Sequence, residues 1–177
     1  MFDDSSHRRS LMIGLPLAFA AIVVTILAIV FAPPCFASTV PQPDDTAHRL
    51  AYAARWLALP GLTLLAGVVA AARRGFYADA IGGTRTPANH GLEINLRYNQ
   101  NTVEQVLLAV IAWPGLALEL PRDALPLIPV AAVLFGVGRI TFWIGYLLHP
   151  MGRAFGMALT AIPALAAYAW LVIRALA

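Results

Sequence analysis

One short stretch of an otherwise apolar chain carries a cation, an amide and a carboxylate at helical spacing. Arg97, Asn101 and Glu104 stand at i, i+4 and i+7, so on a helix they lie within about 60° of one another on a single face. Guanidinium groups bind carboxylates through forked pairs of hydrogen bonds. Together the three side chains could therefore hold a small ligand that has both negative and positive ends.

A second stretch adds two more arginines. Arg139, Phe142 and Tyr146 follow at i, i+3 and i+7, and Arg153 comes shortly after the helix-breaking Pro150. Arg139 lies inside an apolar run, where an arginine is costly unless it meets a counter-charge or water. We therefore expect Arg139 to face the interior of a helix bundle and to find a partner there.

Glu104 is the predicted partner of Arg139, and this pairing allows two interpretations. The ion pair could simply fix the register of two helices. Alternatively, three arginines (Arg97, Arg139 and Arg153) face one carboxylate, which leaves positive charge over for a small anionic ligand in a partly dry cleft.

Composition indicates a membrane protein and excludes several classes of chemistry. Of 177 residues, 60% are hydrophobic and 12% charged, and the mean hydropathy is +0.74. All 12 basic residues are arginine, which excludes a phosphate-loop lysine or a Schiff base. A single cysteine, Cys35, and four scattered histidines do not predict a disulfide or a metal site. The net charge of +3 comes from arginines between apolar spans, which points to membrane orientation and not to nucleic acid.

Hydropathy predicts five membrane-spanning helices, joined by an extended proline-containing linker at 33–49, a polar loop at 73–91 and short turns at 121–123 and 150–153. A helix of about 20 residues crosses a hydrocarbon core of about 30 Å. The proposed spans are residues 11–32, 50–72, 92–120, 125–148 and 154–176. The last three are joined by short turns, so they should be antiparallel neighbours.

The first span has two interpretations, a cleaved secretory signal or a retained anchor. Its uncharged run of 22 residues is about twice the usual apolar length of a signal peptide, which favours the anchor. We therefore divide the chain into an anchor helix with its linker, 1–49, and a four-helix membrane domain, 50–177.

The arginine distribution predicts orientation. With a cytoplasmic amino terminus, eight arginines fall on or toward the cytoplasmic side and four toward the other, as the positive-inside rule requires. The eight are Arg8, Arg9, Arg73, Arg74, Arg85, Arg97, Arg139 and Arg153, and the four are Arg49, Arg55, Arg122 and Arg174. The polar stripes of the third and fourth spans then approach the same membrane surface.

Three separated motifs resemble the MAPEG family, the membrane-associated proteins in eicosanoid and glutathione metabolism. The run 97–105 is similar to the family's RxxxNxxE signature, 138–153 is similar to its later arginine and tyrosine segment, and Arg73-Arg74 matches the basic pair that ends its first helix. The resemblance covers about residues 50–177. It implies an all-α membrane protein with a MAPEG-type four-helix bundle, to which this chain adds one N-terminal transmembrane helix.

The resemblance also implies a homotrimer that binds glutathione between subunits near the cytoplasmic side. By position, the contacts to glutathione would come from Arg74, Arg97, Asn101, Glu104, Arg139 and Tyr146. Arg153 matches the arginine credited in one branch with stabilising the thiolate, and a guanidinium beside sulfur would do so by lowering the thiol's pKa.

The expected function is that of a glutathione-dependent enzyme of a bacterial inner membrane, which conjugates glutathione to lipophilic electrophiles or reduces lipid peroxides. Phe142 and Gln105 replace aromatic hydroxyls of eicosanoid-forming members, so a leukotriene-type reaction is not expected. The alternative is a non-catalytic accessory protein that binds lipid or thiol. A transporter is disfavoured because the chain has no internal repeat.

Overall fold

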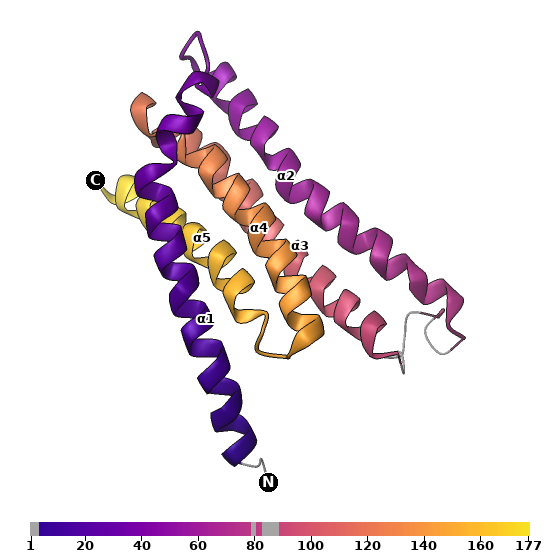
Figure 1. The fold of residues 1–177 in the computed structure, drawn as a ribbon. Coiled ribbons are helices and arrows are strands. Elements are labelled where there is room, and N and C mark those ends of the chain that lie inside the picture. The colour runs from indigo at the N-terminus through magenta and orange to yellow at the C-terminus, as the bar shows by residue number, and fades with distance from the viewer. Residues whose placement is uncertain (1–3, 79–80, 83–88) are drawn as a thin grey trace.

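The structure is an all-helical bundle of five long helices. The computed structural model describes residues 4–78, 81–82 and 89–177, and every regular element in these ranges is helical (Figure 1). Each of the five α-helices is long and apolar enough to cross a membrane, which confirms the predicted fold class. They are α1 (Asp4–Phe31), α2 (Thr46–Ala72), α3 (His90–Glu119), α4 (Leu127–Leu148) and α5 (Ala154–Leu176), with short 3-10 helices η1 (Pro33–Thr39), η2 (Arg73–Phe76) and η3 (Arg122–Ala124) between them.

The chain runs up and down, so the two ends of the bundle carry different connections. One end, called here the Arg153 end, carries the start of α1, the ends of α2 and α3 that flank residues 73–89, and the turn at 149–153. The other, called the Pro121 end, carries residues 32–45, the turn at 120–126 and the carboxyl terminus (Figure 1). The two termini therefore lie at opposite ends, as an odd number of spans requires.

The linker between α1 and α2 contains more helical structure than predicted. Instead of an extended segment over 33–49, η1 forms at once and α2 begins at Thr46. Asp45 caps α2, because its carboxylate accepts the backbone N–H of His48 at 2.9 Å. The same hydrogen bond holds the pKa of the Asp45 carboxyl below its usual value. The cap is thus strongest above that pKa and weakens as the carboxylate is protonated.

Arg49 fastens the start of α2 to the end of α3. Its guanidinium donates to Asp44 at 2.6 Å and to the carbonyl of Leu120 at 2.8 Å. Carbonyls in the last turn of a helix have no partner within the helix, so a cation there satisfies them and complements the helix dipole. The Pro121 end is therefore closed by polar contacts outside the apolar core.

Helices α4 and α5 cross at very close range because glycines remove the side chains between them. A Cβ on Gly145 would meet the backbone of Gly152, and one on Gly156 would meet the backbones of Gly138 and Phe142. Small residues let helices approach closely in membranes, where no hydrophobic force drives association. The turn joining them is closed by His149, whose Nδ1 accepts the N–H of Met151 at 3.0 Å.

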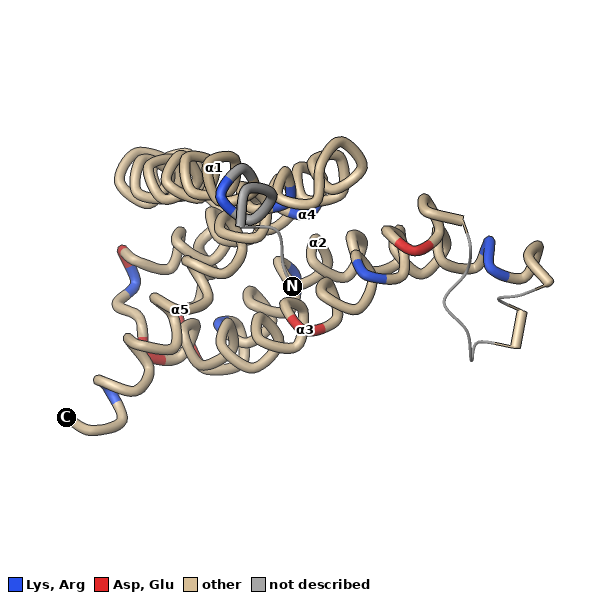
Figure 2. The backbone as a smooth tube through the Cα atoms, turned by 90° about the horizontal axis from the view of Figure 1, so that it is seen from below, with Lys and Arg blue, Asp and Glu red and all other residues tan. Residues whose placement is uncertain are grey.

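The remaining helices flank this pair on opposite sides. Helix α1 packs mainly along α5 and also contacts α4, with Ala21 and Thr25 fully buried. Helix α2 packs mainly on α3, where Gly67 leaves room for the ring of Tyr98. Seen along the bundle from the Arg153 end, α1 and α3 lie on opposite sides (Figure 2). The middle of the molecule is thus the contact of α3, α4 and α5.

We predict that Gly156→Ala destabilises the bundle, because its new methyl group collides with backbone atoms that cannot rotate away. Overpacking of this kind costs about 1–3 kcal/mol. The apparent melting temperature in mild detergent should fall. Gly61→Ala is the matched control, since nothing lies within 4 Å of its added Cβ and alanine is the better helix former. Equal melting temperatures for Gly156→Ala and wild type would contradict the close crossing.

Candidate functional site

Arg139 lies at the centre of the site and joins three helices. It is 0% exposed. From α4, one terminal nitrogen donates to Asn101 Oδ1 on α3 at 2.7 Å, and the other donates to Thr160 Oγ1 on α5 at 2.7 Å. The second nitrogen also donates to the carbonyl of Gly156 at 3.4 Å. The prediction that Arg139 faces the bundle and finds a partner is confirmed, and its partners are neutral oxygens.

The predicted pair between Arg139 and Glu104 is wrong. Glu104 is exposed and accepts hydrogen bonds from Gln100 at 3.0 Å and from Asn101 at 3.5 Å. Asn101 has both an acceptor and a donor on its amide, so it accepts from Arg139 and donates to Glu104. The amide therefore stands between the buried cation and the exposed carboxylate.

A layer of aromatic rings continues from Arg139 toward the Arg153 end. The Arg139 guanidinium carbon lies 4.7 Å from the ring centre of Phe142, which meets the Tyr146 ring edge-on at 5.8 Å. The guanidinium carbon of Arg153 then lies 4.6 Å from the ring centre of Tyr146. Both cations sit over aromatic faces, an arrangement that stabilises a guanidinium with little water around it.

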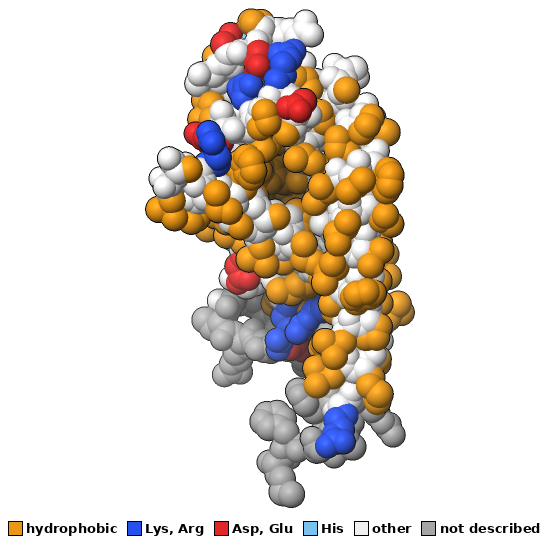
Figure 3. Space-filling model, turned by 90° about the vertical axis from the view of Figure 1, so that its left-hand side faces the viewer, with side chains coloured by type: hydrophobic (Ala, Val, Ile, Leu, Met, Phe, Trp, Pro, Cys, Tyr) orange, Lys and Arg blue, Asp and Glu red, His pale blue; other side chains and the backbone are white. Residues whose placement is uncertain are grey.

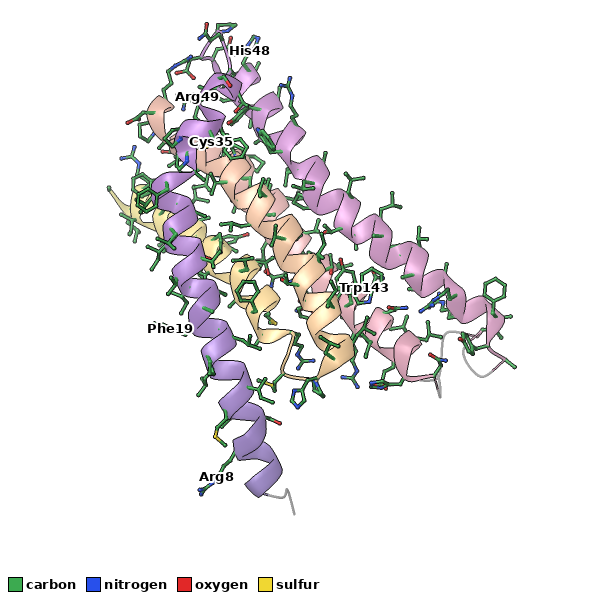
Figure 4. All side chains as sticks on the ribbon, viewed as in Figure 1. Arg8, Phe19, Cys35, His48, Arg49 and Trp143 are labelled. Carbon is green, nitrogen blue, oxygen red and sulfur yellow. The ribbon has the colours of Figure 1, made fainter. Side chains whose placement is uncertain are left out.

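Trp143 and Tyr98 hold this layer against α3. Their rings stack at 4.9 Å, and the Trp143 indole N–H donates to Asn95 Oδ1 at 3.0 Å. Figure 4 shows Trp143 pointing from α4 toward α3. The Tyr98 hydroxyl reaches α2 and donates to the carbonyl of Thr63 at 3.1 Å. The aromatic layer thus connects α2, α3 and α4 at one depth in the bundle.

The other predicted site residues lie at or near the surface of the single chain. Arg97 is exposed and pairs with Glu93 at 2.7 Å. Arg74 is exposed in η2. Within the described part of the chain, no hydrogen bond or ion pair connects Arg74 to the other predicted site residues. The structure therefore joins Asn101, Arg139, Tyr146 and Arg153 through hydrogen bonds and ring contacts, with Glu104 bonded to Asn101. Arg97 pairs with Glu93 on its own helix, and Arg74 lies apart.

Several residues of this network were not predicted from the sequence. Thr160 accepts a hydrogen bond from Arg139. The sequence contained a sign of this role, because Thr160 is one of two hydroxyl-bearing residues in the span 154–176. Asn95 is 2% exposed and its amide nitrogen has no partner.

Charge and polarity, and not metal ligands, characterise the site. Among the described residues, no group of three or more histidine, cysteine or acidic side chains could hold a metal ion. Arg153 is half-buried and takes part in none of the ion pairs between described residues. A cation that is held by a ring and bound to no carboxylate can still accept an anionic ligand.

Comparison with known proteins identifies the family of the chain. A model of the MAPEG family matches residues 50–174, and the chain belongs to that family. The match includes α3, α4 and most of α2 and α5, whereas α1 lies outside it.

Two curated relatives match a shorter stretch. Transmembrane protein 79 of Mus musculus and of Bos taurus are each 32% identical over 79 residues, which is 45% of this chain and 20% of theirs. The match thus spans about a fifth of the length of these relatives. No solved structure matches the chain.

We predict that Thr160→Val destabilises the bundle, because it removes an acceptor from a buried guanidinium. Hydrogen bonds to charged groups contribute about 1.5–3 kcal/mol, so the free energy of unfolding in a denaturing detergent titration should fall by about that amount. Thr141→Val is the matched control on α4. Its hydroxyl donates to carbonyls of its own helix, so we expect a change under about 0.5 kcal/mol. Equal effects of the two substitutions would contradict a stabilising hydrogen bond between Arg139 and Thr160.

Proposed function

We propose that the protein binds glutathione, or a related small thiol with charged ends, at the Arg153 end and uses it on lipophilic substrates. The observation that carries this proposal is Arg153, a half-buried cation held over Tyr146 at 4.6 Å at the end of the bundle where α3 begins. Membership of a family of glutathione and eicosanoid metabolism supports the same ligand. The reaction would be conjugation to an electrophile or reduction of a lipid peroxide.

The polar stripe of α3 has the length of a tripeptide. Arg97 and Glu104 are seven residues apart, a rise of about 10.5 Å along the helix. Three extended residues span about 10–11 Å. In this proposal Arg97 exchanges Glu93 for a ligand carboxylate, and Glu104 accepts the ligand's ammonium group. Asn101, between them, hydrogen-bonds the ligand's backbone.

Arg153 would act on the sulfur of the ligand. A thiol is nucleophilic only as a thiolate, and a nearby guanidinium lowers the thiol's pKa. Helix α5 begins at Ala154, directly after Arg153, so the positive end of its dipole adds to the same effect. Arg139 is 0% exposed, and we assign it a positioning role instead of a contact with the ligand.

The chemistry then needs little more than position and charge. In conjugation, the thiol proton leaves to water, the thiolate forms a bond to the electrophilic carbon, and the leaving group departs with its electron pair. In peroxide reduction, two thiols are oxidised to a disulfide while the peroxide becomes an alcohol and water. In both cases the lipophilic substrate would arrive through the bilayer.

We also propose that the Arg153 end faces the cytoplasm of a bacterial inner membrane. The described arginines near that end include Arg8, Arg73, Arg74, Arg97 and Arg153, whereas Arg85 of the predicted set lies outside the described residues. Over the full sequence, eight arginines fall on or toward this side and four toward the other. The side with more arginine is expected to be cytoplasmic. Glutathione and most other small thiols are kept reduced there.

A homotrimer would complete the ligand site. Arg97 and Glu104 are exposed in the single chain, so one subunit encloses only one side of a ligand bound there. Mass measurement in mild detergent should report three copies of the full chain. A stable monomer that binds glutathione with the affinity of the assembled protein would overturn the shared site.

We predict that Arg153→Ala abolishes thiolate formation and leaves glutathione affinity within about fivefold, since the ligand's charged ends bind elsewhere. Ultraviolet difference spectroscopy of bound glutathione across pH measures the thiolate directly. Arg174→Ala, an exposed arginine at the Pro121 end, is the matched control and should leave both quantities unchanged. Wild-type protein that binds glutathione without a thiolate signal below the solution pKa would favour the accessory-binding alternative.

Glu104→Gln separates binding from activation in the same assay. It keeps the size of the side chain but removes the charge that would meet the ligand's ammonium group, so affinity should fall about tenfold, equivalent to ~1.4 kcal/mol. The bound ligand should still show its thiolate signal at saturating concentration. Unchanged affinity would remove Glu104 from the site.

A further inference from the structure

An apolar cavity lies in the half of the bundle opposite the proposed thiol site. It has a volume of about 320 Å³ and is lined by α1, α3, α4 and α5, including Ile29, Leu116, Val130, Leu134, Pro163 and Trp170. This volume is within the range of small-molecule pockets, about 300–1,000 Å³. Its described lining carries no charged side chain. The cavity therefore offers no charged partner to a polar thiol.

The cavity is separate from the proposed thiol site. On α4 it extends along residues up to Leu134, whereas Tyr146 lies twelve residues further on, a distance of about 18 Å along the helix. One lining residue, Ile29, comes from α1, which is outside the region matched by the family model. The N-terminal helix thus contributes to a space that is otherwise lined by the matched part of the chain.

The mouth of the cavity opens sideways and lies below a group of charged side chains. Figure 3 shows a hollow with an apolar rim between α1 and the rest of the bundle, with arginines and carboxylates gathered toward the Pro121 end. The cavity is lined by membrane-spanning helices, so a lateral opening faces lipid. An occupant that enters there has an apolar part in the bilayer and a head at its surface.

Two arginines beside the mouth are suited to a phosphate. Arg122 directly follows Pro121 of the lining, and Arg174 is one turn beyond Trp170. Their side chains are 42% and 49% exposed. Each contacts one carboxylate, Asp44 at 3.4 Å and Glu119 at 3.5 Å, which leaves most of the five N–H donors of each guanidinium for an anion.

We propose that this cavity holds one acyl chain of a phospholipid whose phosphate binds Arg122 and Arg174. Acyl chains in the bilayer are as apolar as the cavity wall, so burial of the chain gives no hydrophobic gain by itself. Occupancy therefore depends on the phosphate, and an uncharged lipid with the same chains binds weakly. The site does not depend on the proposed thiol chemistry.

The test uses a phosphatidylglycerol that carries a diazirine in the middle of one acyl chain. The full chain in mild detergent is mixed with this probe, irradiated, and its labelled residues are mapped by mass spectrometry. Labels should concentrate on the cavity lining. A diacylglycerol with the same diazirine chain should label the lining at least about fivefold less. Equal labelling by the two probes would overturn the phosphate contact.

Matched variants separate the cavity from the outer surface of α5. Ala166 lines the cavity and is exposed to it, whereas Ala169, also exposed, is not part of the lining. Ala166→Phe should fill the space and lower labelling at least about fivefold, and Ala169→Phe should change it by less than about twofold. Equal labelling of both variants would mean that lipid only coats the helices, which overturns the proposal.

A surface substitution covers the case in which Ala166→Phe does not fold. Arg122→Gln should lower labelling by phosphatidylglycerol several-fold and leave labelling by diacylglycerol unchanged. Arg55→Gln, an exposed arginine on α2 outside the lining, should change neither. Glutathione binding should be unaffected in all these variants, so failure of the lipid site and failure of the thiol site give different results.

Discussion

The burial of one guanidinium organises the bundle. Arg139 is 0% exposed in an apolar helix, and an unpaired charge at that depth would be very costly. Its hydrogen bonds go to Asn101 on α3 and to Thr160 and Gly156 on α5, so these three helices must meet at one depth. The glycines of α4 and α5 allow their backbones to approach that closely. The aromatic layer then continues from Arg139 and sets the position of Tyr146 and Arg153.

Local features were predictable from the sequence, whereas the choice of partners between helices was not. The spans follow from uncharged runs whose length is set by the thickness of the bilayer, and 154–176 matches α5 residue for residue. The partner of Arg139 depends on how α3 is rotated about its axis. Asn101 and Glu104 are three residues apart on nearly the same face, so a small rotation decides between them. Helical periodicity does not contain that information.

The connecting segments were harder to predict for a related reason. Prolines within 33–49 indicated an extended linker, but η1 also contacts a neighbouring helix, and the local sequence does not show that contact. Thr39, for example, hydrogen-bonds Tyr52 of α2 at 3.0 Å.

The two ends of the molecule differ in polarity. The Arg153 end has cations beside amides and aromatic rings, and the Pro121 half encloses an apolar cavity. The two proposed ligands, a thiol and a lipid, follow from this division.

A double-mutant cycle tests the central role of Arg139 most directly. The free energy of unfolding is measured for wild type, Arg139→Met, Thr160→Val and the double variant in the same detergent titration. If Thr160 stabilises the bundle by accepting a hydrogen bond from Arg139, Thr160→Val lowers the free energy of unfolding by about 1.5–3 kcal/mol in wild type. In the Arg139→Met background it lowers it by under about 0.5 kcal/mol. The same cost in both backgrounds would show that the two residues act independently and would contradict the account.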